Sequence, residues 1–131
     1  MAEGQVILIV DDDLTLRELY GERLKEEGYA VTEASDGVEA IKKAQEIPSL
    51  IILDIMLPKT NGIDVVQKIR SDEKTKNIPF IILTALIQEI DKIKKLMTAR
   101  DSYLIKSEQM PKDVIEKVNT TLSESETSSK K

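Results

Sequence analysis

The sequence predicts an α/β fold in which a parallel β-sheet carries helices on both faces. Short apolar runs lie within residues 5–10, 50–54 and 79–84, and such runs are typical of strands that are buried on both sides. Segments with apolar residues at helical spacing separate these runs, and alternating strands and helices predict a parallel sheet. Because each run stops at a polar residue, we expect polar side chains where the strands leave the core.

The composition limits the class of protein. The chain has 131 residues, of which 40% are hydrophobic and 33% charged, so we expect one soluble domain with a substantial core. No apolar run approaches the roughly 20 residues that span a bilayer, and the N-terminus lacks the pattern of a signal peptide. These features favour the cytoplasm. The net charge of −5 argues against nucleic acid as the main partner.

Cysteine and histidine are both absent from the sequence. Their absence excludes disulfides, thiolate metal sites and histidine-dependent general base catalysis. Any bound metal must therefore be held by oxygen ligands, which favours Mg²⁺, Mn²⁺ or Ca²⁺.

The first half of the chain alternates strand and helix in a regular way. The strand at 5–10 precedes a helix that ends at Gly28, where glycine tolerates the left-handed backbone of a C-cap. A short strand follows at 30–34, and Asp36 with Glu39 is expected to cap a second helix. The first helix is expected to bury one apolar face, formed by Leu16, Leu19, Tyr20 and Leu24.

The second half repeats this alternation around the central strand at 50–54. Asn61 begins a third helix, and strands at 79–84 and 102–105 flank a fourth, while Pro111 begins a fifth. After Leu122 no apolar residue follows. We therefore expect a domain over 1–122 and a disordered polar tail, or the start of a linker, over 123–131. The inward residues of the three helices are Ile63, Val66 and Ile69, then Ile90, Ile93 and Met97, then Val114, Ile115, Val118 and Leu122.

Four of the predicted strands end on polar residues with complementary chemistry: Asp11 and Asp12, Asp54, Thr84, and Lys106. In a parallel sheet these ends share one edge, so the side chains converge. Three neighbouring carboxylates repel one another, and Mg²⁺ together with Lys106 would relieve that repulsion. A carboxylate beside Mg²⁺, a hydroxyl and an ammonium group is a site that accepts a phosphoryl group. The alternative is a set of unrelated polar residues at strand ends.

The segments ILIVDDD, LIILDIMLPKTNG, PFIILTA and SYLIK resemble the signature segments of the receiver domain of two-component response regulators. The resemblance covers about residues 5–122. It implies a flavodoxin-like, doubly wound sheet of five parallel strands in the order 2-1-3-4-5 with five helices. It also implies a signalling domain rather than an enzyme, in which Asp54 accepts a phosphoryl group from the phosphohistidine of a histidine kinase or a histidine phosphotransfer protein.

The resemblance assigns a role to each residue of the site. Asp12 would bind Mg²⁺ (or Mn²⁺) directly, together with Asp54 and the backbone carbonyl of Met56. Asp11 would bind it mainly through water. Lys106 would pair with the phosphoryl oxygens.

The resemblance also implies how the phosphorylated state acts and decays. Thr84 and Tyr103 match the switch pair, whose movement would change the face formed by the fourth helix, fifth strand and fifth helix, the family's output surface toward a downstream protein. Met56 and Leu86 flank the approach of the hydrolytic water. Because neither can orient a water molecule by hydrogen bonding, we expect slow loss of the phosphoryl group.

Three positions depart from the family pattern. Ser107 follows Lys106 where the family usually has a proline after a cis bond; since a cis bond before a non-proline residue costs about 2.5–4 kcal/mol, we expect a trans bond and a different loop. Ala99 replaces a frequent glycine after the fourth helix, and Asn61 replaces a common aspartate while remaining a good N-cap.

Two other functions stay open at this point. Asp11, Asp13 and Thr15 also satisfy the nucleophile loop of haloacid-dehalogenase-like phosphatases, with Asp11 as nucleophile and Asp13 as acid/base, although Asp54 would then have no role. The other alternative is a receiver that docks partners without being phosphorylated. We expect a stand-alone signalling protein, but the sequence names neither the kinase nor the output partner, and a removed effector domain after Ser123 would change that expectation.

Overall fold

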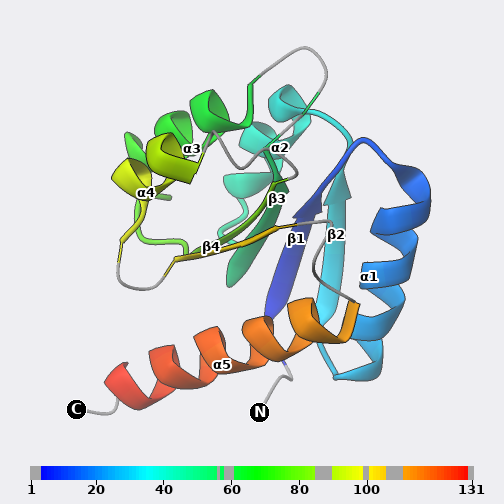
Figure 1. Cartoon of the computed structure of the whole chain (residues 1–131). Coiled ribbons are helices and arrows are strands. Elements are labelled where there is room, and N and C mark those ends of the chain that lie inside the picture. The colour runs from blue at the N-terminus through cyan, green and yellow to red at the C-terminus, as the bar shows by residue number, and fades with distance from the viewer. Residues whose placement is uncertain are drawn as a thin grey trace.

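The computed structural model describes residues 4–55, 57, 61–84, 90–98, 101–105 and 111–129, with residues 90, 96, 111 and 124–129 described by their backbone alone. Within this part of the chain, five strands alternate with five helices (Figure 1). In chain order they are β1 (Val6–Val10), α1 (Leu14–Glu26), β2 (Ala30–Ala34), α2 (Gly37–Ala44), β3 (Leu50–Asp54), α3 (Gly62–Arg70), β4 (Phe80–Thr84), α4 (Ile90–Leu96), β5 (Ser102–Ile105) and α5 (Pro111–Ser129).

The strands form one parallel sheet in the order β2-β1-β3-β4-β5, which confirms the predicted fold class and strand order. The chain leaves β1 toward β2 on one side and later returns to place β3 on the other side of β1. In open α/β sheets, ligands bind at such a reversal, outside the carboxyl ends of the strands. The carboxyl ends of β1 and β3 are therefore the place to look for a site.

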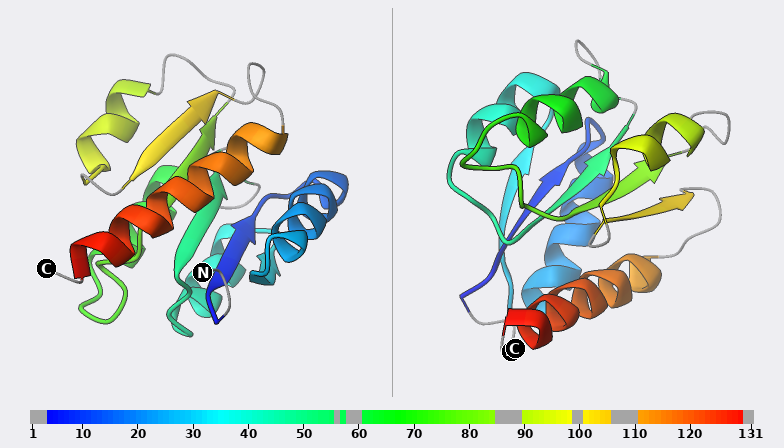
Figure 2. Two further views of the ribbon diagram at one scale, coloured as in Figure 1. Left: turned by 90° about the horizontal axis from the view of Figure 1, so that it is seen from below. Right: turned by 90° about the vertical axis from the view of Figure 1, so that its left-hand side faces the viewer.

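Two helical layers cover the sheet (Figure 2). Alternate residues of each strand point to opposite faces, so that Leu8 and Val10 pack toward α2, α3 and α4, whereas Ile7 and Ile9 pack toward α1 and α5. Every residue of β3 and β4 is buried, as the uninterrupted apolar runs predict. No helix in the described part of the chain is both long and apolar enough to cross a bilayer.

The predicted helix ends are confirmed at three positions. Gly28 has a φ of 99°, the left-handed conformation expected of a C-cap glycine. Asp36 accepts a hydrogen bond from the Glu39 amide at 2.9 Å, and the Glu39 carboxylate in turn accepts one from the Ser35 amide at 2.7 Å. Asn61 caps α3 by accepting from the Ile63 amide at 2.7 Å.

The structure differs from the sequence prediction at Leu19, which is 36% exposed. Leu16 and Tyr20 pack inward with Leu24, four residues further along the same stripe. Leu19 projects about 100° away from the middle of that stripe, because each helical residue turns by about 100°. The buried face of α1 is therefore narrower than predicted.

The backbone of α5 also continues beyond the expected end of ordered structure at Leu122. The helix includes residues 123–129, where a disordered tail was expected, and this segment contains neither of the helix-breaking residues glycine and proline. The apolar face nevertheless ends at Leu122, which is 4% exposed. The domain boundary after residue 122 stays a prediction.

Candidate functional site

Three carboxylates meet where β1 and β3 leave the core. Asp11 and Asp12 directly follow β1, and Asp54 is the last residue of β3. Because β1 and β3 are neighbours and Val10 lies opposite Leu53, the ends of the two strands are level. One carboxylate oxygen from each of the three residues lies within 4.8 Å of the others. Asp11 and Asp54 are buried, whereas Asp12 is exposed, so the cluster opens to solvent on one side.

The loop between β1 and α1 is held by its own hydrogen bonds. The Asp11 amide donates to the Ala34 carbonyl at 3.1 Å, and one oxygen of the Asp11 side chain accepts from the Asp13 amide at 2.9 Å. The Asp13 side chain accepts from the Leu16 amide at 3.2 Å and is the N-cap of α1. Asp13 thus has a structural task, which does not favour its role as the acid/base of a phosphatase.

On the other side of the cluster, the chain after Asp54 turns back onto itself. The Ile55 amide donates to the Leu83 carbonyl at 2.9 Å, and the Gly62 amide donates to the Ile55 carbonyl at 3.0 Å. A Cβ atom at Gly62 would lie only 2.5 Å from that carbonyl oxygen and 2.6 Å from the Ile55 Cα. Residue 62 must therefore be glycine for the start of α3 to approach the backbone beside Asp54 this closely.

Thr84 and Tyr103 lie on the strands beyond β3. Thr84 ends β4 fully buried, one position past Leu83, which pairs with Asp54. Tyr103 is half-buried on the α4 side of β5, with the Lys94 ammonium nitrogen 5.9 Å from the centre of its ring. The placement of both residues is compatible with the predicted switch pair, and their roles stay predictions.

Several predicted residues fall outside the described part of the chain. These are Met56, Leu86 and Lys106 of the predicted site, and Ala99 and Ser107 among the departures from the family pattern. Their roles also stay predictions.

The described donors fit a hard divalent cation. All three are carboxylates, and oxygen ligands are those that Mg²⁺ prefers. Placing acidic groups this close, two of them buried, is unfavourable unless positive charge is nearby. A Mg²⁺ ion held by Asp11, Asp12 and Asp54 would supply that charge.

Sequence reasoning missed Arg17. Its Nη1 donates to the Asp11 carbonyl oxygen at 2.7 Å, and its Nε donates to the Glu33 carboxylate at 3.0 Å. The prediction named Lys106 as the only compensating cation, but a second cation thus lies against the acidic loop. The available signal was a long basic side chain in the first turns of α1, since helical side chains point back toward the N-terminus.

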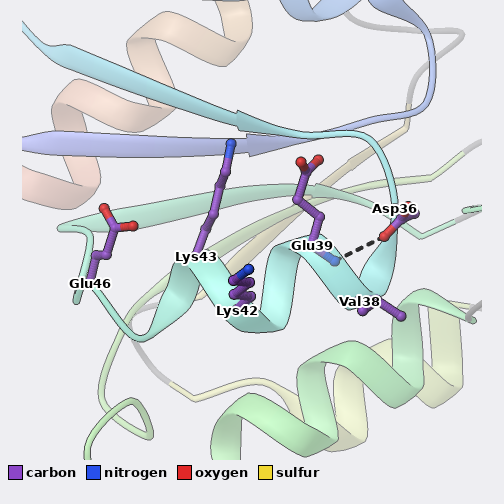
Figure 3. A pocket seen from close by; sticks show the side chains of 6 residues that line it. All are labelled: Asp36, Val38, Glu39, Lys42, Lys43 and Glu46. Atoms are coloured by element: carbon purple, nitrogen blue, oxygen red, sulfur yellow. Dashed lines mark hydrogen bonds between the residues drawn. The ribbon is translucent and has the colours of Figure 1, made fainter.

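A hollow of about 490 Å³ lies elsewhere, along α2 (Figure 3). Asp36 caps the helix there, and Lys43 points away from α2 toward the strands, where its ammonium group donates to the Glu33 carbonyl. These polar groups hold α2 in place, and no residue of the carboxylate cluster lines the hollow. Its lining residues are Asp36, Val38, Glu39, Lys42, Lys43 and Glu46.

Comparisons with known proteins agree with this geometry. Residues 7–119 match the sequence model of the response regulator receiver domain. The alkaline phosphatase synthesis transcriptional regulatory protein PhoP of Bacillus subtilis is 41% identical over 121 residues, which cover 92% of this chain and 49% of PhoP. The DNA-binding dual master transcriptional regulator RpaA of Synechocystis is 45% identical over 101 residues, which cover 76% of this chain and 42% of RpaA. The chain thus spans about half the length, or less, of these curated relatives.

Solved structures give the same result. The chemotaxis response regulator CheY4 of Vibrio cholerae superposes with a TM-score of 0.79 at 28% identity, covering 89% of this chain and 98% of CheY4. The response regulator protein TrrA of Thermotoga maritima, solved in complex with Mg²⁺-BeF, superposes with a TM-score of 0.76 at 35% identity, with the same two coverages of 89% and 98%.

Proposed function

Because this chain belongs to the response regulator receiver domain family of two-component signalling, we propose that it accepts a phosphoryl group on Asp54 and thereby changes its binding to a downstream protein. The observation that carries the proposal is the convergence of the Asp11, Asp12 and Asp54 carboxylates within 4.8 Å at the ends of β1 and β3. The phosphodonor would be the phosphohistidine of a histidine kinase or of a histidine phosphotransfer protein.

In the proposed transfer, an Asp54 carboxylate oxygen attacks the phosphorus atom of the phosphohistidine. A phosphorus–oxygen bond forms while the phosphorus–nitrogen bond breaks, and the electron pair of the broken bond stays on the imidazole nitrogen, which takes up a proton from water. Because Asp54 is only 4% exposed, its burial restricts the directions from which the phosphorus atom can approach.

Mg²⁺ would be held by Asp11, Asp12, Asp54 and, by family resemblance, the Met56 carbonyl. When bound, it would neutralise charge on the acids and on the phosphoryl oxygens. In the same proposal, the Lys106 ammonium group and the Thr84 hydroxyl group hold phosphoryl oxygens. The Thr84 hydroxyl and the Tyr103 ring then carry the change to the face formed by α4, β5 and α5.

The proposal makes the chain a signalling domain that works in the cytoplasm and whose only chemistry is its own phosphorylation and slow dephosphorylation. Two observations disfavour the phosphatase alternative: Asp13 caps α1, and Asp54 would have no role in a phosphatase of that class. The names of PhoP and RpaA describe transcriptional regulators roughly twice as long as this chain, and that of RpaA also names DNA binding. We assign neither property to this chain.

Intact mass spectrometry tests the proposal. Incubation with acetyl phosphate and Mg²⁺ should raise the mass by one phosphoryl group, and EDTA or Asp54→Ala should abolish the gain. Asp91→Ala, which removes an exposed carboxylate from α4, is the matched control and should label like the wild type. Full labelling of Asp54→Ala combined with loss of labelling in Asp11→Ala would refute the receiver function.

A further inference from the structure

We propose that Arg17 is a positioning residue of the phosphorylation site, which holds the peptide between Asp11 and Asp12 so that the three carboxylates converge. The inference rests on the proposed function, because it concerns the same carboxylate cluster. The signature segments that resemble receiver domains do not include Arg17, and the names of the relatives give this residue no role.

The first step is the contact itself. Arg17 Nη1 donates to the Asp11 carbonyl oxygen at 2.7 Å, a charge-assisted hydrogen bond and therefore stronger than a neutral one. The Arg17 side chain is only 13% exposed, so water competes little for this bond. Since the Asp11 carbonyl and the Asp12 amide share one planar peptide unit, fixing the carbonyl fixes where the Asp12 side chain begins.

The second step is that the other groups of Asp11 are also held. Its amide donates to the Ala34 carbonyl on β2, and its side chain accepts from the Asp13 amide. Asp12, in contrast, is exposed, and its carboxylate depends for its position on the backbone that carries it. Loss of the Arg17 bond would therefore displace Asp12 more than Asp11.

The third step is that Arg17 is itself anchored. Its Nε donates at 3.0 Å to the carboxylate of Glu33, a residue of the edge strand β2. The Glu33 backbone carbonyl accepts from the Lys43 ammonium group, which reaches over from α2 on the opposite face of the sheet. Figure 3 shows Lys43 extending from α2 toward the strands. The acidic loop is thus tied through Arg17 and Glu33 to helices on both faces.

The geometry needs arginine rather than lysine. Two N–H groups of one planar guanidinium bond two acceptors, a backbone carbonyl and a carboxylate, in fixed directions. A lysine at position 17 keeps the charge but offers one compact ammonium group on a flexible stem. Arg17→Lys should therefore restore part of the function that Arg17→Gln removes.

The test measures Mg²⁺ affinity of the full chain by isothermal titration calorimetry, and labelling by acetyl phosphate across a range of Mg²⁺ concentrations. Groups that orient metal ligands typically contribute 10–100-fold to affinity, so Arg17→Gln should weaken Mg²⁺ binding about tenfold or more. Arg17→Lys should fall between this variant and the wild type. At saturating Mg²⁺ the labelling rate of Arg17→Gln should return to within about threefold of the wild-type rate. The variant displaces a Mg²⁺ ligand, mainly the Asp12 carboxylate, but leaves the phosphoacceptor Asp54 intact, so excess Mg²⁺ compensates for the weaker binding.

Arg23→Gln is the matched control, since it makes the same change of charge at an exposed position of α1. Thermal melts without Mg²⁺ show whether each variant is folded at the assay temperature. If Arg17→Gln is not folded at that temperature, the Mg²⁺ affinity of Arg17→Lys is compared with that of Arg23→Lys instead. Equal Mg²⁺ affinities of the Arg17 variant and its Arg23 control would overturn the positioning role. If the wild type is still labelled at Asp54 in that case, the proposed function stands. Failure of the wild type to label would instead refute the proposed function.

Discussion

The close approach of Gly62 to Ile55 makes a sharp prediction, because a single methyl group should disturb the backbone beside Asp54. In Gly62→Ala the new Cβ would lie 2.5 Å from the Ile55 carbonyl oxygen, whereas Cβ atoms essentially never come within 3.0 Å of a heavy atom outside their own and the adjacent residues. The start of α3 or the Ile55 peptide must then shift by at least about 0.5 Å. The hydrogen bond between the Gly62 amide and the same carbonyl, 3.0 Å long, would be strained by that shift.

The cost follows from these two effects. Overpacking against a fixed backbone costs about 1–3 kcal/mol, and weakening one buried hydrogen bond adds about 0.5–1.5 kcal/mol. We expect Gly62→Ala to lower the free energy of unfolding by about 1.5–4.5 kcal/mol, which lowers the melting temperature by roughly 6–18 °C in a domain of this size. Because Ile55 follows Asp54 directly, Mg²⁺ binding and labelling by acetyl phosphate should weaken as well.

The chain contains a control for the same substitution. A Cβ at Gly21, in the middle of α1, would meet only Val31 Cγ1 at 3.7 Å and Ile9 Cδ1 at 3.9 Å, which are ordinary contacts. Gly21→Ala should therefore stabilise the protein by up to about 1 kcal/mol through helix propensity. Thermal and urea unfolding of both variants measures the contrast. A Gly62→Ala variant that melts at or above the wild-type temperature would show that the backbones do not approach as described.

Three further predictions concern charge and decay. Asp12→Ala should raise the melting temperature without Mg²⁺ while weakening Mg²⁺ binding, because it removes one of three mutually repelling carboxylates; a lower melting temperature without Mg²⁺ would mean that they are not strained. Met56→Asn/Leu86→Glu should speed decay of the phosphorylated protein by roughly tenfold or more, equivalent to about 1.4 kcal/mol in the barrier; equal or slower decay in a phosphate-release assay would refute the shielding role. Asp101→Ala should lower the free energy of unfolding in urea by about 3 kcal/mol, because Asp101 pairs with Arg70 and accepts from the Phe80 amide at 2.8 Å; an unchanged midpoint would contradict this.

Much of the fold was predictable because burial leaves a direct mark on the amino-acid pattern. The runs at β3 and β4 are apolar throughout, and both strands are buried at every position. The spatial order of the strands leaves no such mark, and it came from the resemblance to receiver domains. Leu19 shows the limit of the helical pattern, since spacing alone does not say how wide the buried stripe of α1 is.

The candidate site was predictable where it consists of residues at strand ends. Asp11, Asp12 and Asp54 follow or end parallel strands, so strand alternation placed all three at one edge of the sheet. That β1 and β3 are neighbours followed from the resemblance to receiver domains. The contacts of Arg17 could not be predicted in this way. One acceptor is the backbone carbonyl of Asp11, and the other is the carboxylate of Glu33 on β2, which is not adjacent to Arg17 in the sequence. The role of Gly62 was likewise hidden, since its constraint comes from a loop that closes on Ile55.

The most direct test of the central claim is to locate the phosphoryl group. The protein is incubated with acetyl phosphate and Mg²⁺ and reduced with borohydride, which converts the aspartyl phosphate to homoserine, and its peptides are then sequenced by mass spectrometry. We predict homoserine at position 54, with Asp11 and Asp12 unmodified. Homoserine at position 11 with Asp54 intact would contradict the account.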